Sequence, residues 1–194
     1  MSGTISLDYW LKFHHWSKWY YDKYLKEHPD QQFNLKTGEF EVKPKLRSLP
    51  YTLHILRGQV GTVERPVNIT KYGEWMDANG LPWCASFVSW VLHTAGFSGH
   101  GSASAQRLYD QFRKRGRSGK TPRVGAAIFF HMRGGHAGVN HTGMVVGVSR
   151  FWVDTIEGNT SSGVSGSQIN GGGVYPRRRL RGPSIVGYGY PAYE

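Results

Sequence analysis

Residues 83–96 have the sequence WCASFVSWVLHTAG, which carries a clear helical pattern. Its apolar side chains recur at spacings of three and four residues, which is typical of the buried face of an α-helix. The turn-forming cluster DANGLP at residues 77–82 precedes the pattern, and Gly96 follows it as a C-terminal cap. The sequence therefore predicts a buried helix that begins near Cys84, the only cysteine of the chain.

The elements on either side of this helix are segregated along the chain. We expect an aromatic-rich helix between residues 5 and 28, a linker or small hairpin between residues 31 and 49, and a short helix between residues 106 and 114. Beyond these, the hydrophobic pattern changes toward that of strands. This order indicates an α+β domain in which N-terminal helices pack on an antiparallel β-sheet. The strands are expected at residues 124–132, 141–148, 151–157, 174–180 and 185–190.

The length of 194 residues and the hydrophobic content of 39% fit one well-sized domain with an extension. We expect residues 1–50 to form an aromatic-rich helical extension and linker, and residues 51–194 to form the main domain. No apolar run approaches the roughly 20 residues that cross a bilayer, which excludes a membrane-spanning protein. A single cysteine excludes an internal disulfide and a cysteine-rich zinc site. The N-terminus does not resemble a secretory signal, so we expect synthesis in the cytosol.

The chain is strongly basic, because 24 Lys and Arg residues against 13 Asp and Glu residues give a formal charge of +11. Such a charge attracts polyanions, and nucleic acid, anionic lipid and the phosphate-rich polymers of a bacterial wall are all candidates on this ground. An equally open alternative is that the basic runs form a solvated surface. The two runs lie at residues 113–123 and 177–181.

Cys84 is a candidate nucleophile because of its place at the start of a helix. Unpaired backbone N–H groups and the positive end of the helix dipole favour the thiolate there. The alternative is a structural role, since unpaired cysteines are among the most buried residues.

His141 is the best candidate for the base, because its predicted strand pairs with one that ends in Glu157 and Asn159. If Gly147 faces Phe151, paired residue numbers sum to 298 and His141 lies opposite Glu157; a sum of 300 places Asn159 there instead. Either even register puts all three side chains on one face of the sheet, and an odd register separates them. An acceptor beside the imidazole would fix its tautomer and stabilise its cation. The alternatives are a structural histidine and a surface acid at the strand end.

Five blocks of this sequence together resemble the CHAP domain, the cysteine- and histidine-dependent amidohydrolase/peptidase module of bacteriophage endolysins and bacterial wall hydrolases. The resemblance extends from about residue 68 to residue 190, and its one visible departure is Gly125-Ala126, where CHAP sequences commonly have Gly-Asp. The blocks are NITKYGEWMDANGLPWCASFVSWVLHTAG, PRVGAAIFF, NHTGMVVGV, VDTIEGNTSS and GGGVYPRRRLRGPSIVGYGYP.

The resemblance implies a papain-like α+β fold for residues 51–194 as a catalytic domain. It also implies that Cys84 is the nucleophile, His141 the base, and Glu157 with Asn159 the orienting residues. We therefore expect a peptidoglycan amide hydrolase of the endolysin type, either an N-acetylmuramoyl-L-alanine amidase or an endopeptidase, acting through a thioester. The alternative is a catalytically inactive module that binds the cell wall or a polyanion on a papain-like fold.

Other side chains could bind substrate or metal. Tyr72, Trp75 and Trp83 could line a substrate groove near the thiol, or they could pack in the core. Asp77 and Asn79 offer two oxygen ligands, whereas calcium needs about six or more. Zinc could be imagined at His14, His15, His131 or His136, but none of these four has a partner at zinc-ligand spacing. We expect no metal and no cofactor.

The expected partners follow from this reading. We expect a monomer that acts on bacterial peptidoglycan and is attracted to anionic wall polymers, with no nucleic acid partner. The enzyme is expected to accumulate in the host cytoplasm and to reach the wall after the membrane is breached. A phage-tail hydrolase that bores inward during infection is compatible with the same residues.

Overall fold

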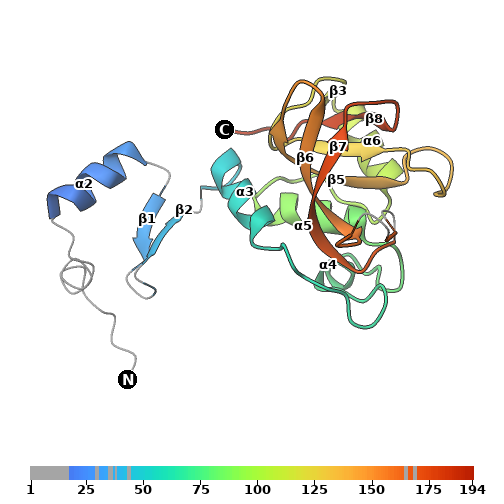
Figure 1. Cartoon of the computed structure of the whole chain (residues 1–194), viewed down its shortest axis with the longest axis horizontal. Coiled ribbons are helices and arrows are strands. Elements are labelled where there is room, and N and C mark those ends of the chain that lie inside the picture. The colour runs from blue at the N-terminus through green and yellow to red at the C-terminus, as the bar shows by residue number, and fades with distance from the viewer. Residues whose placement is uncertain are drawn as a thin grey trace. The chain divides into compact units, whose positions relative to one another are not determined.

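The computed structural model describes residues 18–28, 31–34, 37, 39–42, 45–163, 166–167 and 170–194 (Figure 1). The chain divides into two compact units, Met1–Lys45 and Leu46–Glu194. The first unit contains helix α2 (Lys18–Glu27) and an antiparallel pair of strands, β1 (Gln31–Asn34) and β2 (Glu39–Val42). The part of the expected N-terminal helix before Lys18 lies outside the described residues.

In the described part of the second unit, the helices precede the main sheet, and capping side chains explain where three of them begin. The hydroxyls of Ser48, Thr70 and Ser104 each accept a hydrogen bond from the backbone N–H three residues later. The first of these helices begins at Leu49, before residue 51, where the sequence places the start of the main domain. The helices are α3 (Leu49–Arg57), α4 (Lys71–Trp75), α5 (Cys84–Thr94) and α6 (Ala105–Lys114).

A six-stranded sheet forms the other half of the second unit, with the strand order β3-β8-β4-β5-β6-β7. Every neighbouring pair in this order is antiparallel. This confirms the predicted α+β class, in which helices pack on an antiparallel sheet. The strands are β3 (Ser118–Gly119), β4 (Ala127–Phe130), β5 (His141–Val148), β6 (Trp152–Thr160), β7 (Gly173–Leu180) and β8 (Ile185–Gly189).

Helix α5 is the core helix, and it packs against β5 and β6 (Figure 1). A glycine on β6 permits this close approach, because a Cβ atom at Gly158 would lie 2.8 Å from atoms of Phe87 and Trp83. Alternation along β4 divides the buried residues between two faces of the sheet. Phe129 belongs to the cluster around α5, whereas Ile128 and Phe130 belong to a second cluster on the opposite face.

A β-bulge in the hairpin of β5 and β6 sets the register at the candidate site. Near the turn, Gly147 pairs with Asp154, whereas farther along Val145 pairs with Thr155. The residue between them on β5, at position 146, is the extra residue of the bulge. The turn therefore has an odd register, which by itself would separate His141 from Glu157. The bulge restores an even register, the one in which paired numbers sum to 300, so the expected pairing of Gly147 with Phe151 is wrong.

Candidate active site

Cys84 is the first residue of α5 and is 4% exposed. The preceding residue, Trp83, occupies the N-cap position and forms no side-chain capping bond to the helix. Its indole Nε1 donates instead to Glu64 Oε2 at 2.7 Å, which fixes the ring in the core. The backbone N–H groups of the first helical turn are therefore not capped by Trp83, and they lie beside the thiol.

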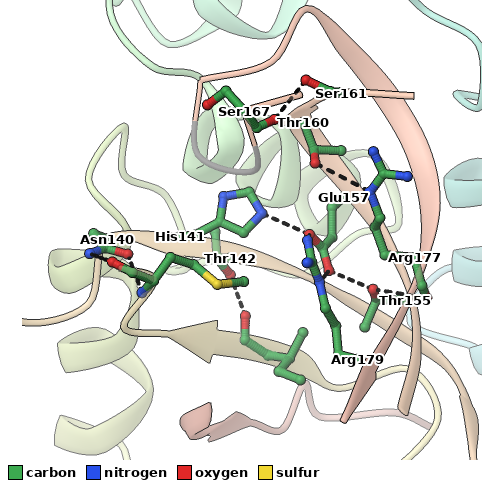
Figure 2. Close-up of polar contacts among 12 residues, drawn as sticks. Asn140, His141, Thr142, Thr155, Glu157, Thr160, Ser161, Ser167, Arg177 and Arg179 are labelled. Atoms are coloured by element: carbon green, nitrogen blue, oxygen red, sulfur yellow. Dashed lines mark hydrogen bonds and ion pairs between the residues drawn. The ribbon is translucent and has the colours of Figure 1, made fainter. Parts of the chain in front are cut away.

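His141 opens β5 and is fully buried. The loop before it is held by Asn140, whose side chain accepts a hydrogen bond from Met132 N at 2.8 Å and donates to the carbonyls of Met132 and His136 at 2.9 Å. The His141 Nε2 atom lies 2.8 Å from Glu157 Oε2, as Figure 2 shows. The other ring nitrogen, Nδ1, is buried and forms no other hydrogen bond with the described residues, so it is available to the Cys84 thiol.

Glu157 lies on β6, is fully buried, and accepts hydrogen bonds from three side chains (Figure 2). Besides His141, Thr155 Oγ1 donates to Oε1 at 2.6 Å, and Arg179 Nε donates to Oε1 at 2.9 Å. Arg179 Nη2 also donates to Oε2. A buried carboxylate is tolerated when it is paired and hydrogen-bonded in this way.

The space for this carboxylate comes from a glycine on the neighbouring strand. A Cβ atom at Gly143 would lie 2.5 Å from Glu157 Cγ and 2.9 Å from the Ile156 carbonyl oxygen. Gly143 therefore faces Glu157 and has no side chain to block it. The carboxylate reaches diagonally to His141, two residues away on β5, a distance that cross-strand neighbours on one face can span.

The pKa values of His141 and Glu157 shift in opposite directions. Burial by itself would lower the pKa of His141, but hydrogen bonding and charge at Cys84 and Glu157 outweigh burial and raise it to about 9. Burial would raise the pKa of Glu157, but its hydrogen bonds to Arg179 and His141 and their charges lower it to about 2. Near neutral pH the arrangement therefore favours an imidazolium held between the Cys84 side chain and an ionised carboxylate.

Asn159 has a different environment from the one that the sequence suggested. Its backbone adopts a left-handed conformation with φ of 57°, at a register shift between β6 and β7. Asparagine tolerates this conformation better than most residues. Although the register near the site is the one that would place Asn159 opposite the imidazole, the hydrogen bond to His141 Nε2 goes to Glu157. The expectation that this register makes Asn159 the partner is therefore wrong, because Gly143 leaves room for the longer acid.

The three aromatic residues expected to line a groove near the thiol have different environments. Tyr72 and Trp83 are fully buried and stack with ring centroids 5.6 Å apart. Both belong to the core around α5, so the prediction that they contact substrate is wrong for this structure. Trp75 is 39% exposed, but its ring lies against His93, near the C-terminal end of α5 and away from Cys84.

The two expected oxygen donors near Cys84 serve the turn. Asn79 Oδ1 accepts a hydrogen bond from Thr70 N at 3.2 Å, and Asp77 adopts a left-handed conformation with φ of 52°. Within the described ranges, His, Cys, Asp and Glu side chains do not gather in groups of three that could hold a metal ion.

Arg179, Thr155 and Gly143 are functional candidates that the sequence analysis missed. The signal for Arg179 was the period of two in VYPRRRL, which places positions 177 and 179 on one face of β7 and position 178 on the other. In the structure Arg178 pairs with the exposed Asp154 at 2.7 Å, whereas Arg179 reaches the buried Glu157. The basic run is therefore divided between a surface face and the candidate site.

The CHAP domain family model matches residues 76–159 of the chain, a segment that holds Cys84, His141, Glu157 and Asn159. No curated protein matches the chain. In the described residues, every helix is too short or too polar to cross a membrane. With a cysteine at the start of the core helix and a histidine on the sheet of a papain-like α+β fold, residues 76–159 match the CHAP domain family.

Proposed function

We propose that this protein hydrolyses an amide bond of peptidoglycan through a Cys84 thiolate. The match of residues 76–159 to the CHAP domain family supports a cysteine- and histidine-dependent amidohydrolase or peptidase that acts on the cell wall. The observation that carries the proposal is the buried His141, which interacts with the Cys84 side chain and with a Glu157 carboxylate bound by Arg179.

The first half of the reaction forms a thioester. His141 holds the proton of Cys84 as an imidazolium, and the thiolate sulfur attacks the amide carbonyl carbon. Backbone N–H groups of the first turn of α5, including that of Cys84, stabilise the oxyanion. The C–N bond then breaks, and the imidazolium gives its proton to the departing amine.

The second half releases the acid. Water gives a proton to His141 and attacks the thioester carbon, the C–S bond breaks, and the carboxylic acid leaves while the thiolate is restored. Glu157 keeps the imidazole in one orientation and stabilises its cation in both halves. Arg179 and Thr155 act through Glu157, so they are positioning residues.

The finer assignment is an endolysin-type enzyme that reaches the wall from the host cytoplasm after the membrane is breached. The bond is either N-acetylmuramoyl-L-alanine or a peptide bond of the stem or cross-bridge. The formal charge of +11 supports attraction to anionic wall polymers.

Turbidity of purified peptidoglycan tests the proposal. We expect the wild type to clear the suspension, and Cys84→Ser to remain inactive, because a serine hydroxyl does not easily form an anion at this site. Iodoacetamide should abolish lysis in parallel with alkylation of the single thiol. Mass spectrometry of the fragments then identifies the bond, since amidase products carry a free lactyl group and endopeptidase products carry a new peptide N-terminus. Lysis by Cys84→Ser at the wild-type rate would contradict the mechanism.

A further inference from the structure

A pocket lies at the C-terminal end of α5, in a part of the molecule that the proposed reaction does not use. Its volume is about 380 Å³, and Trp75, His93, His100 and Gln111 are among the residues that line it. His93 is nine residues beyond Cys84 on the same helix, which corresponds to about 14 Å along the helix axis. The volume lies within the range of about 300–1,000 Å³ that is typical of small-ligand sites.

The wall of this pocket is built on a loop that α5 and α6 hold in place. Gln111 on α6 forms two hydrogen bonds of 3.0 Å with the backbone of Gly101. Ser89 on α5 similarly forms two hydrogen bonds, of 3.0 and 3.1 Å, with the backbone of Ser102. The His100 ring stacks on Phe112 with centroids 4.3 Å apart. A wall fixed in this way reduces the conformational entropy lost when a ligand binds.

The side chains that face this pocket combine an aromatic surface with neutral hydrogen-bonding groups. Trp75 is 39% exposed, with its ring centroid 5.0 Å from that of His93. His100 is 8% exposed, and its buried Nδ1 atom has no hydrogen-bond partner among the described residues. Burial and the nearby Arg115 and Arg117 lower the pKa of His100 to about 4, so the imidazole is neutral at pH 7. The neutral ring presents a flat surface beside the indole, and Gln111 adds an amide side chain to the lining.

We propose that this pocket binds an N-acetylated sugar ring of the glycan strand. The C–H face of a pyranose can stack on the exposed indole of Trp75. Its hydroxyl and acetamido groups can form hydrogen bonds with the polar groups of the loop that Gln111 and Ser89 hold in place. The lining residues include no carboxylate, and Trp75, Ser98 and Gln111 are uncharged, which suits a neutral sugar. The inference rests on the proposed function, because peptidoglycan supplies such sugars. A site about 14 Å along α5 from Cys84 would hold the glycan while its peptide reaches the nucleophile.

Binding to a peptide-free saccharide tests the site without hydrolysis. The full-length Cys84→Ala protein is titrated with the β-1,4-linked tetramer of N-acetylglucosamine by calorimetry, and tryptophan indole N–H signals are followed by NMR. We expect saturable binding that shifts the Trp75 indole signal, which Trp75→Phe assigns by its disappearance. Trp75→Ala should weaken binding at least tenfold, whereas Trp75→Phe keeps an aromatic ring and should lose less. Trp152→Ala is the matched control, because Trp152 is 42% exposed and lies on β6.

Three results would overturn the inference: no binding of the tetramer, equal binding by Trp75→Ala and the parent protein, or shifts confined to other indoles. If the tetramer does not bind, or binds independently of Trp75, but the wild-type protein lyses walls, only the proposed sugar pocket is refuted. Tetramer binding that depends on Trp75, together with no hydrolysis of walls by the wild type, refutes only the proposed reaction. The two proposals are therefore separable.

Discussion

Glu157 is a buried carboxylate that three side chains of the candidate site bind. It lies in an environment where an isolated charge would be strongly destabilised, and His141, Thr155 and Arg179 together offset that cost. Removing one partner of such a buried pair leaves the other charge uncompensated. Single substitutions at Glu157 or at one of its partners therefore test the role of this carboxylate.

Arg179→Gln should lower both stability and turnover, because it leaves the Glu157 carboxylate buried with fewer donors. We expect the free energy of unfolding to fall by about 3 kcal/mol or more. The pH above which activity declines should also move, since the charge of Glu157 acts on His141. The measurements are denaturant unfolding and the pH profile of turnover on purified walls.

Arg178→Gln is the matched control for Arg179→Gln. It removes the same charge one residue away, but Arg178 pairs with the exposed Asp154 rather than with the site. We expect no measurable change in stability or in the pH profile. Equal effects of the two substitutions would show that Arg179 acts through net charge and not through Glu157.

Glu157→Gln should lower turnover by about tenfold or more, because the amide cannot stabilise an imidazolium by charge. The pKa of His141 is raised to about 9 by Cys84 and Glu157, so the imidazolium persists up to that pH. Without the negative neighbour the imidazolium loses its proton at lower pH, and the alkaline limb of the pH profile should shift downward. The limb is measured as turnover on purified walls between pH 6 and 10.

Asn159→Gly provides the comparison for Glu157→Gln. Glycine tolerates the left-handed backbone at this position, so the change removes the amide with little strain. We expect a smaller loss of turnover and little movement of the alkaline limb. A larger shift in Asn159→Gly than in Glu157→Gln would make Asn159 the functional partner of His141.

At the scale of elements, the hairpin of β5 and β6 determines which side chains share a face. The bulge in β5 changes the register from odd at the turn to even at the site. Gly143 then faces Glu157 on the face that also carries His141. The strand pair therefore brings His141 and Glu157 together through backbone geometry as much as through the residues themselves.

Gly143→Ala should displace Glu157 and reduce activity. The new Cβ atom would lie 2.9 Å from the Ile156 carbonyl oxygen, which is backbone and cannot easily move. We expect a loss of about 1–3 kcal/mol in unfolding free energy, as in other overpacked sites, and a loss of lysis. Unfolding by denaturant and turbidity clearance measure the two effects.

Gly147→Ala on the same strand is the control. Its Cβ atom would first meet a carboxylate oxygen of Asp154, at 3.1 Å, near the hairpin turn. Because this neighbour is the end of a side chain, it can shift, and we expect lysis close to that of the wild type. Similar losses in both variants would indicate that any added methyl group disturbs β5, whether or not it faces Glu157.

At the scale of the whole molecule, the positive charge is the feature most relevant to a wall substrate. Arg113, Lys114 and Lys120 are exposed on and after α6, so they can approach a polyanion. Replacing all three with Gln should weaken sedimentation with walls at low salt and have little effect at high salt. The Debye length falls from about 10 Å at 0.1 M to about 3 Å at 1 M ionic strength.

The matched control replaces Lys18, Lys23 and Lys26 with Gln, which removes the same charge from α2. We expect this variant to sediment with walls nearly as the wild type does. If both triple variants lose binding equally, net charge and not the surface around α6 attracts the wall. Unchanged binding of both at each salt concentration would assign the basic residues to a solvated surface.

Elements with local signals could be predicted from the order of the amino acids alone. Apolar spacing of three and four residues, a preceding turn and Gly96 specify α5 and place Cys84 at its start. Alternating strands placed His141 at the beginning of β5 and Glu157 near the end of β6. These features depend on residues that are close together in the chain, so they can be predicted without knowledge of the tertiary structure.

Which of these side chains meet depends on how the strands and helices pack in three dimensions. From the sequence, the observed register was expected to place Asn159 opposite His141. Because of the bulge in β5 and the absence of a side chain at Gly143, Glu157 is instead the residue hydrogen-bonded to His141. Packing against α5 buried Tyr72 and Trp83, while β7 brought Arg179 to Glu157 from 22 residues away in sequence. Such outcomes depend on strand register and on the volume left between distant segments, and neither quantity is encoded in a local pattern.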